Sequence, residues 1–223
     1  MSAVLDARAI LFDGALLTIQ LFLAAACLTI VMSIVAGVLR QSPVRWIRWL
    51  VVAYVETFRG TSVVVQMFWI YFALPSLGLK LDAFPTAIVA LGLCFGAYGS
   101  EVVRGAIAAV PKEQYEAAIA LNMRPLERLR SVILPQAFIV ALPPYTNILV
   151  LLLKSTAAAS LITIPELTFR ATALNQITYQ TTWIFGTILV VYFLLASIIS
   201  KAMRGLETRC SHWRRPIPSE SPA

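Results

Sequence analysis

Charged residues are scarce in this chain, and histidine and cysteine are nearly missing. Only 13% of the 223 residues are charged, whereas 59% are hydrophobic. Soluble globular domains are about one quarter charged and about half apolar, so this composition excludes a water-soluble domain and, more firmly, a disordered chain. Several apolar runs reach the roughly 20 residues that cross a bilayer as a helix. The chain is therefore expected to be a polytopic membrane protein.

The missing residue types also exclude several kinds of chemistry. The single histidine, His212, rules out every metal motif that needs two histidines. The three cysteines show neither a Cys-x-x-Cys spacing nor the pattern of a disulfide framework. No lysine follows a glycine, so the Gly-Lys-Ser/Thr step of a nucleotide-binding P-loop is absent from the sequence. We therefore expect no catalytic residues, no metal ligands and no cofactor bound by this chain.

The apolar residues form five segments that can each span a membrane. These segments cover about residues 14–39, 49–74, 84–103, 132–153 and 183–200. The first is expected to be a retained span rather than a signal peptide, because Met1–Asp13 lacks a basic start and the apolar run continues about 12 residues past Cys27. The fold class predicted from this pattern is an all-α membrane protein with five transmembrane helices.

The positions of the basic residues predict the orientation in the membrane. Most of the 18 Lys and Arg residues lie in the loops 40–48 and 104–131 and after residue 200. Five crossings put these three segments on one side, which the positive-inside rule assigns to the cytoplasm. The N-terminal segment 1–13 is then external, residues 14–207 form the membrane domain, and residues 208–223 form a cytoplasmic tail that we expect to be disordered.

The longest cytoplasmic connection, about residues 108–135, has a regular pattern of its own. Pro111 suits the first turn of a helix over residues 112–121, and Asn122 accepts a left-handed backbone that ends such a helix. Pro125 then starts a second short helix over residues 126–134, which is expected to end before Pro135. From this pattern alone, an amphipathic hairpin at the membrane surface is an equally good interpretation.

The residues of this loop resemble the EAA loop of ABC importer permeases. That motif is Glu-Ala-Ala, three residues, glycine, nine residues, then an aliphatic residue, any residue and Leu-Pro. Here Glu116-Ala117-Ala118 precedes Asn122 at the glycine position, and Leu134-Pro135 closes the motif. Asn122 is one departure from the motif, and Glu113 is another, because glycine is usual before Gln114.

The resemblance to permeases for polar amino acids extends from about residue 14 to residue 207. Glu56-Thr-Phe-Arg59-Gly-Thr-Ser62 with Gln66 is similar to the Glu-x-x-Arg-Gly-Thr-Pro…Gln signature of these permeases, with serine in place of proline. Three more segments of this chain resemble other signatures of these permeases: Tyr98–Ile107, Asn147 with Lys154-Ser155-Thr156, and Pro165-Glu166-Leu167.

The resemblance implies a type I ABC importer permease with a cytoplasmic coupling helix between its third and fourth spans. Such a permease lies in the bacterial inner membrane, pairs with an identical or different permease, docks onto two ATPase subunits and receives substrate from an extracytoplasmic solute-binding protein. ATP and Mg would bind the ATPase, not this chain. The implied coupling residues are Glu116, Ala117, Ala118, Leu121, Asn122, Leu134 and Pro135. The implied substrate is a polar amino acid or a similar zwitterion, for example the compatible solute ectoine.

Polar side chains within the spans are candidates for the substrate path. Charges in a bilayer are costly and are functional candidates by default. The candidates are Glu56, Arg59, Gln66, Glu101, Asn147, Lys154, Ser155 and Glu166. Arg59 and Gln66 share one face if the second span is a single helix. The alternative is that Glu56–Arg59 and Glu101–Arg104 are self-neutralising pairs that hold helices together.

Two further patterns concern helix shape. Gly92 and Gly96 form a Gly-x-x-x-Gly pattern, which favours close helix packing over a ligand site. Pro143-Pro144 lies near mid-depth of the fourth span and predicts a break, with a second half-helix from Tyr145 whose free N–H groups could bind an anionic substrate group. A simple proline kink is an equally good interpretation. We expect a pocket between the second and fourth spans at this depth.

Other function classes fit the sequence less well. A serine protease within the membrane needs histidine in a span, and His212 lies after the last one. An aspartyl type needs two intramembrane aspartates, whereas Asp6, Asp13 and Asp82 all lie outside the spans. A passive channel or scaffold would not need the patterned docking loop.

Overall fold

The computed structural model describes residues 2–211, and every regular element in that range is helical. The longer helices are α1 (Ser2–Leu39), α2 (Arg45–Gly60), α4 (Ala83–Ala108), α7 (Leu134–Ser155), α8 (Leu167–Thr178) and α9 (Thr181–Ser211). The short helices are α3 (Val63–Phe68), α5 (Lys112–Ala120) and α6 (Pro125–Arg128). The described range also contains two π-helical segments, η1 (Trp69–Ala73) and η3 (Leu129–Ile133). It contains two 3-10 segments as well, η2 (Leu74–Leu77) and η4 (Thr156–Ile162).

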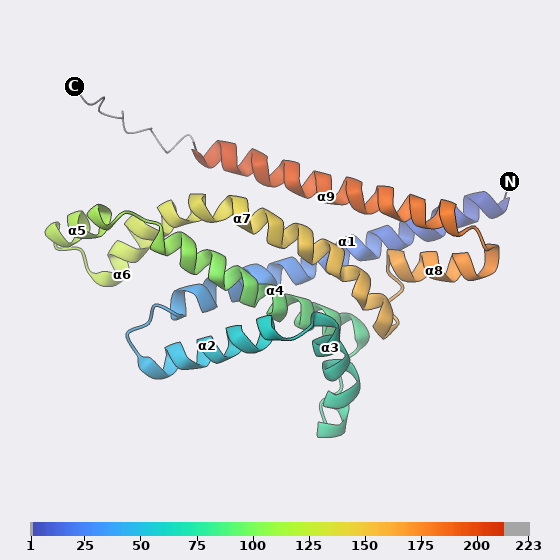
Figure 1. The fold of residues 1–223 in the computed structure, drawn as a ribbon, viewed down its shortest axis with the longest axis horizontal. Helices are drawn as coiled ribbons and strands as arrows, with labels where there is room; N and C mark the ends of the chain where they lie inside the picture. Colours follow the sequence, from blue (N-terminus) through green and yellow to red (C-terminus); the bar gives the residue numbers. More distant parts are fainter. Residues whose placement is uncertain (1, 212–223) are drawn as a thin grey trace.

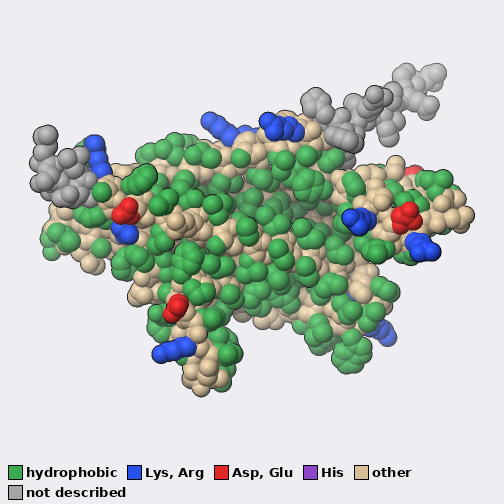
Figure 2. Space-filling view, turned by 180° about the vertical axis from the view of Figure 1, so that it is seen from behind, with side chains coloured by type: hydrophobic (Ala, Val, Ile, Leu, Met, Phe, Trp, Pro, Cys, Tyr) green, Lys and Arg blue, Asp and Glu red, His purple; other side chains and the backbone are tan. Residues whose placement is uncertain are grey.

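By length and composition, the described helices provide four apolar spans, or five if one bent pair crosses as a single span, which agrees with the predicted all-α membrane fold. Four are long and apolar enough on their own: Arg8–Leu39, Ala83–Ala108, Pro125–Ile162 and Thr181–Cys210. The fifth is a bent pair, Arg45–Gly60 with Val63–Leu77. The chain direction changes by 105° between its two halves. In Figure 1 the four long spans run lengthwise, whereas α3 projects sideways from them. On the face that Figure 2 shows, the middle of the molecule is covered mainly by hydrophobic side chains, as lipid contact requires.

The core is densest where α1 packs against α4, and glycines make that approach possible. A Cβ atom added at Gly92 would lie 2.5 Å from the side chain of Leu28, and one at Gly96 would lie 2.6 Å from that of Met32. Real Cβ atoms do not approach this closely, so only glycine allows the two backbones to come so near each other. The prediction that the Gly-x-x-x-Gly pattern serves helix packing is confirmed.

The two ends of the bundle differ in charge. The loop between α1 and α2, the α5–α6 segment and the C-terminal end of α9 lie at one end, which we call the basic end (Figure 1). The beginning of α1 and α8 lie at the opposite end, where Arg170 pairs with Asp13 at 3.5 Å. The three basic segments therefore share one end, as five crossings predict. Which side of the membrane that end faces remains a prediction.

The second span differs from its prediction as a single helix. α2 stops at Gly60, Thr61 and Ser62 are extended, and α3 starts at Val63. Gly60 is a poor helix former because it loses the most backbone freedom on ordering. Arg59 and Gln66 therefore do not share a face of one helix.

The fourth span corrects the expected break at Pro143-Pro144, because α7 continues through both prolines. Both prolines are exposed, while Leu142 before them and Ile148 after them are buried in the bundle. Packing on both sides of the proline pair holds the helix together despite the lost backbone hydrogen bonds. No second half-helix begins at Tyr145, so the anion site expected there does not form.

The start of the fourth span and the two chain ends also differ from expectation. The second short helix does not end before Pro135; α6 merges through η3 into α7. In the π-turn the Leu134 N–H bonds the carbonyl of Leu129, which shifts the hydrogen-bond register just where proline lacks its own donor. α1 already begins at Ser2, and α9 includes residues 208–211 of the expected tail. The rest of that tail lies outside the described residues.

Candidate functional site

The break between α2 and α3 is held by side chains that cap the end of α2. Gln66 Nε2 donates to the carbonyl oxygen of Phe58 at 2.9 Å, to that of Thr61 at 3.3 Å and to Thr61 Oγ1 at 2.7 Å. From α4, Tyr98 Oη donates to the carbonyl of Arg59 at 3.3 Å. Cys94 Sγ lies 3.6 Å from the Phe58 carbonyl and adds a weak hydrogen bond. Helix-end carbonyls need such partners inside a membrane, so the break is a built feature.

A hollow opens beside this break. It has a volume of about 330 Å³ and lies between the break, α4 and α7. Its walls are formed by Thr61, Ser62, Val63, Cys94, Phe95, Tyr98, Ile148, Leu151 and Ser155. At the same break Gln66 Oε1 is buried without a hydrogen-bond partner among the described residues. The hollow thus combines an apolar wall with a few hydroxyl groups, as sites for small polar ligands do.

An ionic cluster joins three helices on the α4 side of the break. Glu101 accepts from Arg104 Nη2 at 2.8 Å and from Arg104 Nε at 2.9 Å, which confirms the pair of residues three apart. Arg40, just after α1, also pairs with Glu101. Arg59 Nη1 lies 3.9 Å from Glu101, and its guanidinium lies 5.5 Å from the ring centroid of Tyr98. Three arginines around one carboxylate leave the cluster positively charged.

The remaining path candidates lie around the hollow to different degrees. Ser155 lines it, whereas Asn147 and Lys154 are exposed on α7. At 100° per residue, these two positions lie about 20° from each other, at one edge of the face of α7 that carries Ile148, Leu151 and Ser155. Glu56 is exposed on α2 and forms no ion pair within the described residues, so the alternative pairing of Glu56 with Arg59 does not occur.

Glu166 lies apart from the break, in a polar network between α1, α8 and α9. Its side chain is fully buried and caps α8, with Oε1 accepting from the backbone N–H of Phe169 at 2.8 Å. Oε2 accepts from Tyr192 Oη at 3.1 Å and from Thr18 Oγ1 at 3.4 Å. Burial raises the pKa of Glu166 above its usual value, although the hydrogen bonds from Phe169 and Tyr192 act against the rise. Its assignment to the substrate path stays a prediction.

The segment α5–α6 forms an elbow at the basic end. Asn122 has a left-handed φ of 53°, as predicted. Its N–H bonds the carbonyl of Ile119 at 2.8 Å, and the N–H of Met123 bonds that of Ala118 at 3.1 Å. These two bonds form a Schellman motif, which ends α5 and turns the chain into α6. Pro111 precedes α5 as its N-cap rather than as its first residue.

One side of the elbow is fixed and the other is free. Ala118 is buried, Tyr115 packs beside Val110 and Ile133, and Arg128 lies 6.0 Å from the Tyr115 ring centroid. Glu116 and Ala117 are exposed, as are Leu121 at 76% and Leu126 at 75%. Of the other predicted coupling residues, Asn122 and Pro135 are exposed and Leu134 is half-buried at the start of α7. A firmly seated elbow with exposed apolar tips is suited to insertion into another protein.

Three residues that sequence reasoning did not assign contribute to the break or to the ionic cluster. Arg40 was expected only as a loop cation, yet it pairs with Glu101 across 61 positions of sequence. Cys94 and Tyr98 cap α2 from α4. Their spacing of four residues puts them on one face of α4. Tyr98 also lies about one turn before Glu101. That shared face, and the place of Tyr98 at the start of one permease-like signature, are the signals that the sequence carries for these two residues.

Comparison with known proteins adds independent information. A model of the family described as binding-protein-dependent transport system inner membrane component matches residues 29–209. The chain is 40% identical over 207 residues to the probable amino-acid ABC transporter permease protein y4tF of Sinorhizobium fredii, covering 90% of this chain and 87% of the relative. It is 34% identical over 205 residues to the L-cystine transport system permease protein TcyB of Bacillus subtilis, covering 92% and 88%. A crystal structure of an amino acid ABC transporter with histidines matches with a TM-score of 0.85 and 29% identity over 93% of this chain and 97% of that one.

Proposed function

Since the chain belongs to the family of binding-protein-dependent transport system inner membrane components, we propose that it forms the translocation path of an importer for polar amino acids or similar small zwitterions. The relatives it resembles are named as amino-acid permeases, and one is named for L-cystine. These relatives are transport components, not enzymes. Ectoine, a zwitterion derived from an amino acid, belongs to the same substrate class.

The exposed elbow of α5 and α6 is the observation that carries this proposal. A transporter driven by a separate ATPase needs a part that transmits movement without deforming. The Schellman turn at Asn122 and the buried Ala118 make the elbow stiff. Exposed Glu116 and Ala117 present a small surface that can enter a cleft of the ATPase closely. Leu121 and Leu126 then add apolar area to the contact.

The hollow at the α2–α3 break is our candidate for the substrate path. A zwitterion needs partners of both charge signs, because burial of either charge unpaired is costly. Arg59 offers a cation close to Tyr98, which lines the hollow, and Glu101 offers a carboxylate that it shares with Arg40 and Arg104. Hydroxyls of Thr61, Ser62 and Ser155 can hydrogen-bond the ligand there. Asn147 and Lys154 lie together at one edge of this wall and complete the candidate set.

The proposed assembly has several partners that are separate from this chain. Two ATPase subunits bind ATP and Mg, a second permease subunit pairs with this one, and an extracytoplasmic solute-binding protein delivers the substrate. The N-terminus then faces outward and the basic end faces the cytoplasm. The excess of Lys and Arg at that end supports this orientation.

The elbow assignment can be tested with Ala117→Arg. A large side chain should overfill the cleft, so we expect ATP-driven uptake of labelled glutamine or cystine into proteoliposomes to fall at least about tenfold, because even a 1.4 kcal/mol loss of docking energy is tenfold. Substrate-stimulated ATP hydrolysis should fall with it, while membrane insertion stays normal. Ala202→Arg is the matched control, since Ala202 is exposed at the same end but on α9.

Two outcomes would contradict the proposal. Coupled uptake at the wild-type rate in Ala117→Arg would remove the elbow from the ATPase contact. Uptake that needs neither ATP nor the ATPase subunits would indicate a passive channel, which is the alternative function. An intramembrane protease is not favoured by any contact in the described residues.

A further inference from the structure

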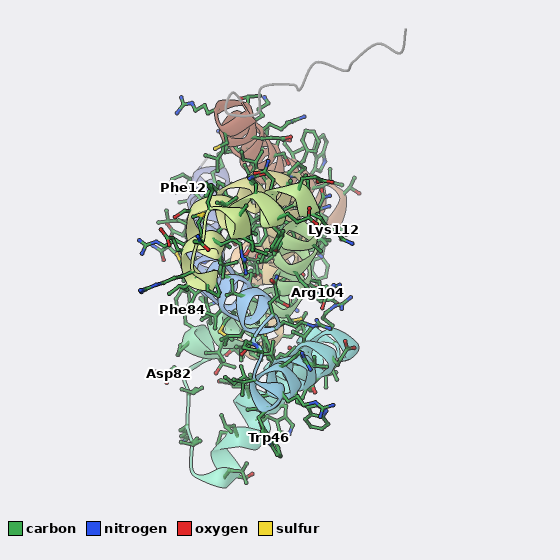
Figure 3. All side chains as sticks on the ribbon, turned by 90° about the vertical axis from the view of Figure 1, so that its left-hand side faces the viewer. Phe12, Trp46, Asp82, Phe84, Arg104 and Lys112 are labelled. Atoms are coloured by element: carbon green, nitrogen blue, oxygen red, sulfur yellow. The ribbon has the colours of Figure 1, made fainter. Side chains whose placement is uncertain are left out.

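The first half of α2 is almost free of contacts with the rest of the described chain. Every residue from Arg45 to Leu50 is exposed, and α2 is first buried at Val51. The side chains of Trp46 and Trp49 are 79% and 72% exposed. In Figure 3, which looks onto the basic end, Trp46 lies on the side of α2 away from the main bundle, the side on which α3 also projects. Six consecutive exposed residues, two of them tryptophans, need a covering partner.

The two arginines of this half-helix also have no acidic partner among the described residues. Arg45 and Arg48 form no ion pair among the described residues. The nearest carboxylate along α2 is Glu56, two turns further towards the break. The neighbouring loop adds Arg40, which is already paired with Glu101, and no acidic residue. Unlike the arginines around Glu101, these two are available to an external anion.

Arginine and tryptophan alternate here in a way that fits one type of ligand. Arg45, Trp46, Arg48, Trp49 and Val52 line an open hollow of about 750 Å³ on α2. Two guanidinium groups can each hold a phosphate through paired N–H donors. Indole rings lie favourably at the boundary between acyl chains and headgroups. Val52 extends the surface towards the apolar interior.

We propose that the first half of α2 is a binding site for the phosphate of an anionic phospholipid at the basic end. Charge complementarity identifies this occupant, because Arg45 and Arg48 are exposed without an ion pair among the described residues, beside two exposed tryptophans at the start of the second span. The lipid would cover the helix where the chain itself does not. Before the break, α2 packs on the bundle through an apolar cluster of Val51, Tyr54 and Val55 with Ala36 of α1, so a bound lipid would also fix the position of its first half.

Native mass spectrometry of the purified permease–ATPase complex can test the site. The complex is supplied with equal amounts of phosphatidylglycerol and phosphatidylethanolamine, and the lipids that stay bound are counted. We expect wild type to retain phosphatidylglycerol selectively and the Arg45→Gln/Arg48→Gln variant to retain about tenfold less. The control pair Lys201→Gln/Arg204→Gln removes the same charge from exposed positions at the same end and should leave retention unchanged. Arg45→Lys/Arg48→Lys keeps charge without the paired donors and should fall in between.

Several results would overturn the proposal. Unchanged phosphatidylglycerol retention in the Gln pair would exclude these arginines as the site. Equal loss in the control pair would indicate general attraction to a basic surface. If the Gln pair retains phosphatidylglycerol but the second permease or the ATPase dissociates from the complex, this face of α2 is a protein interface instead. If the Gln pair does not assemble, the Lys pair decides, and wild-type retention there would exclude the paired phosphate contacts.

Discussion

The two sharp bends in this chain are built in opposite ways. The elbow turns at Asn122 through backbone bonds between residues at most five positions apart. The break at Thr61–Ser62 turns the chain by 105° and is held by Gln66, Cys94 and Tyr98, two of which come from α4. The elbow needs little from the rest of the molecule, whereas the break exists only in the folded bundle.

This difference matches the tasks that we propose for the two bends. A part that transmits force benefits from a turn that keeps its shape when its surroundings move. A substrate path benefits from a turn whose shape depends on neighbouring helices, since their rearrangement can then change the hollow. The following substitutions separate the two designs.

The largest effect is expected at the break, with Gln66→Leu. This change leaves the carbonyls of Phe58 and Thr61 without their amide donor and should destabilise the fold by about 2 kcal/mol. At the elbow, Gln136→Leu removes only an exposed hydrogen bond to Gln114 and should change stability by less than about 0.5 kcal/mol. Thermal unfolding in detergent measures both. Equal effects would contradict the contrast between the bends.

A smaller effect is expected from Asn122, where the elbow depends on a left-handed residue. Asn122→Val should destabilise the elbow by about 1 kcal/mol, because a branched side chain clashes in this conformation. Asn122→Gly should preserve stability and coupled transport, since glycine adopts the same φ freely. Unfolding midpoints and uptake rates give the comparison. A valine variant as stable as the glycine variant would mean that the turn does not depend on φ at this residue.

The smallest effect is expected at a third turn, between η4 and α8, which combines both designs. Thr163 has a left-handed φ of 67°, and Glu166 caps α8 while binding side chains of α1 and α9. A raised pKa means that the folded protein holds this proton more tightly than the unfolded chain does. The contribution of Glu166 to stability is therefore complete below the unfolded pKa and is lost as pH rises through the raised folded pKa.

Glu166→Gln tests this sign because glutamine does not titrate. Wild type should lose stability relative to the variant as pH rises above about 4.3, the usual value for glutamate, and the difference should level off above the folded pKa. Unfolding midpoints between pH 4 and pH 8 measure it. A wild type that gains stability relative to the variant over this range would show that the hydrogen bonds to Glu166 outweigh its burial.

Much of the fold was predictable because its signals are local or compositional. Apolar length predicted the five spans, and the spacing of Gly92 and Gly96 predicted close helix packing, although only the structure identified α1 as the partner. The elbow was predictable because proline and Asn122 act on their own backbone. The Glu101–Arg104 pair followed from helical spacing.

The predictions that failed concern helices whose continuity depends on distant neighbours. Pro143 and Pro144 remove donors, yet buried residues on both sides keep α7 in one piece. Gly60-Thr61-Ser62 was expected within a helix, and capping from α4 makes a break there stable. The pairing of Arg40 with Glu101 was hidden for the same reason, since the partners lie on different helices.

The sequence by itself determined which helices are apolar enough to span a membrane and where the elbow turns, because hydrophobic length and backbone preference act over a few residues. Only the tertiary structure decided which bend opens a hollow and which charges meet beside it. In a membrane every buried carbonyl and charge needs a partner, and that partner comes from whichever helix packs alongside.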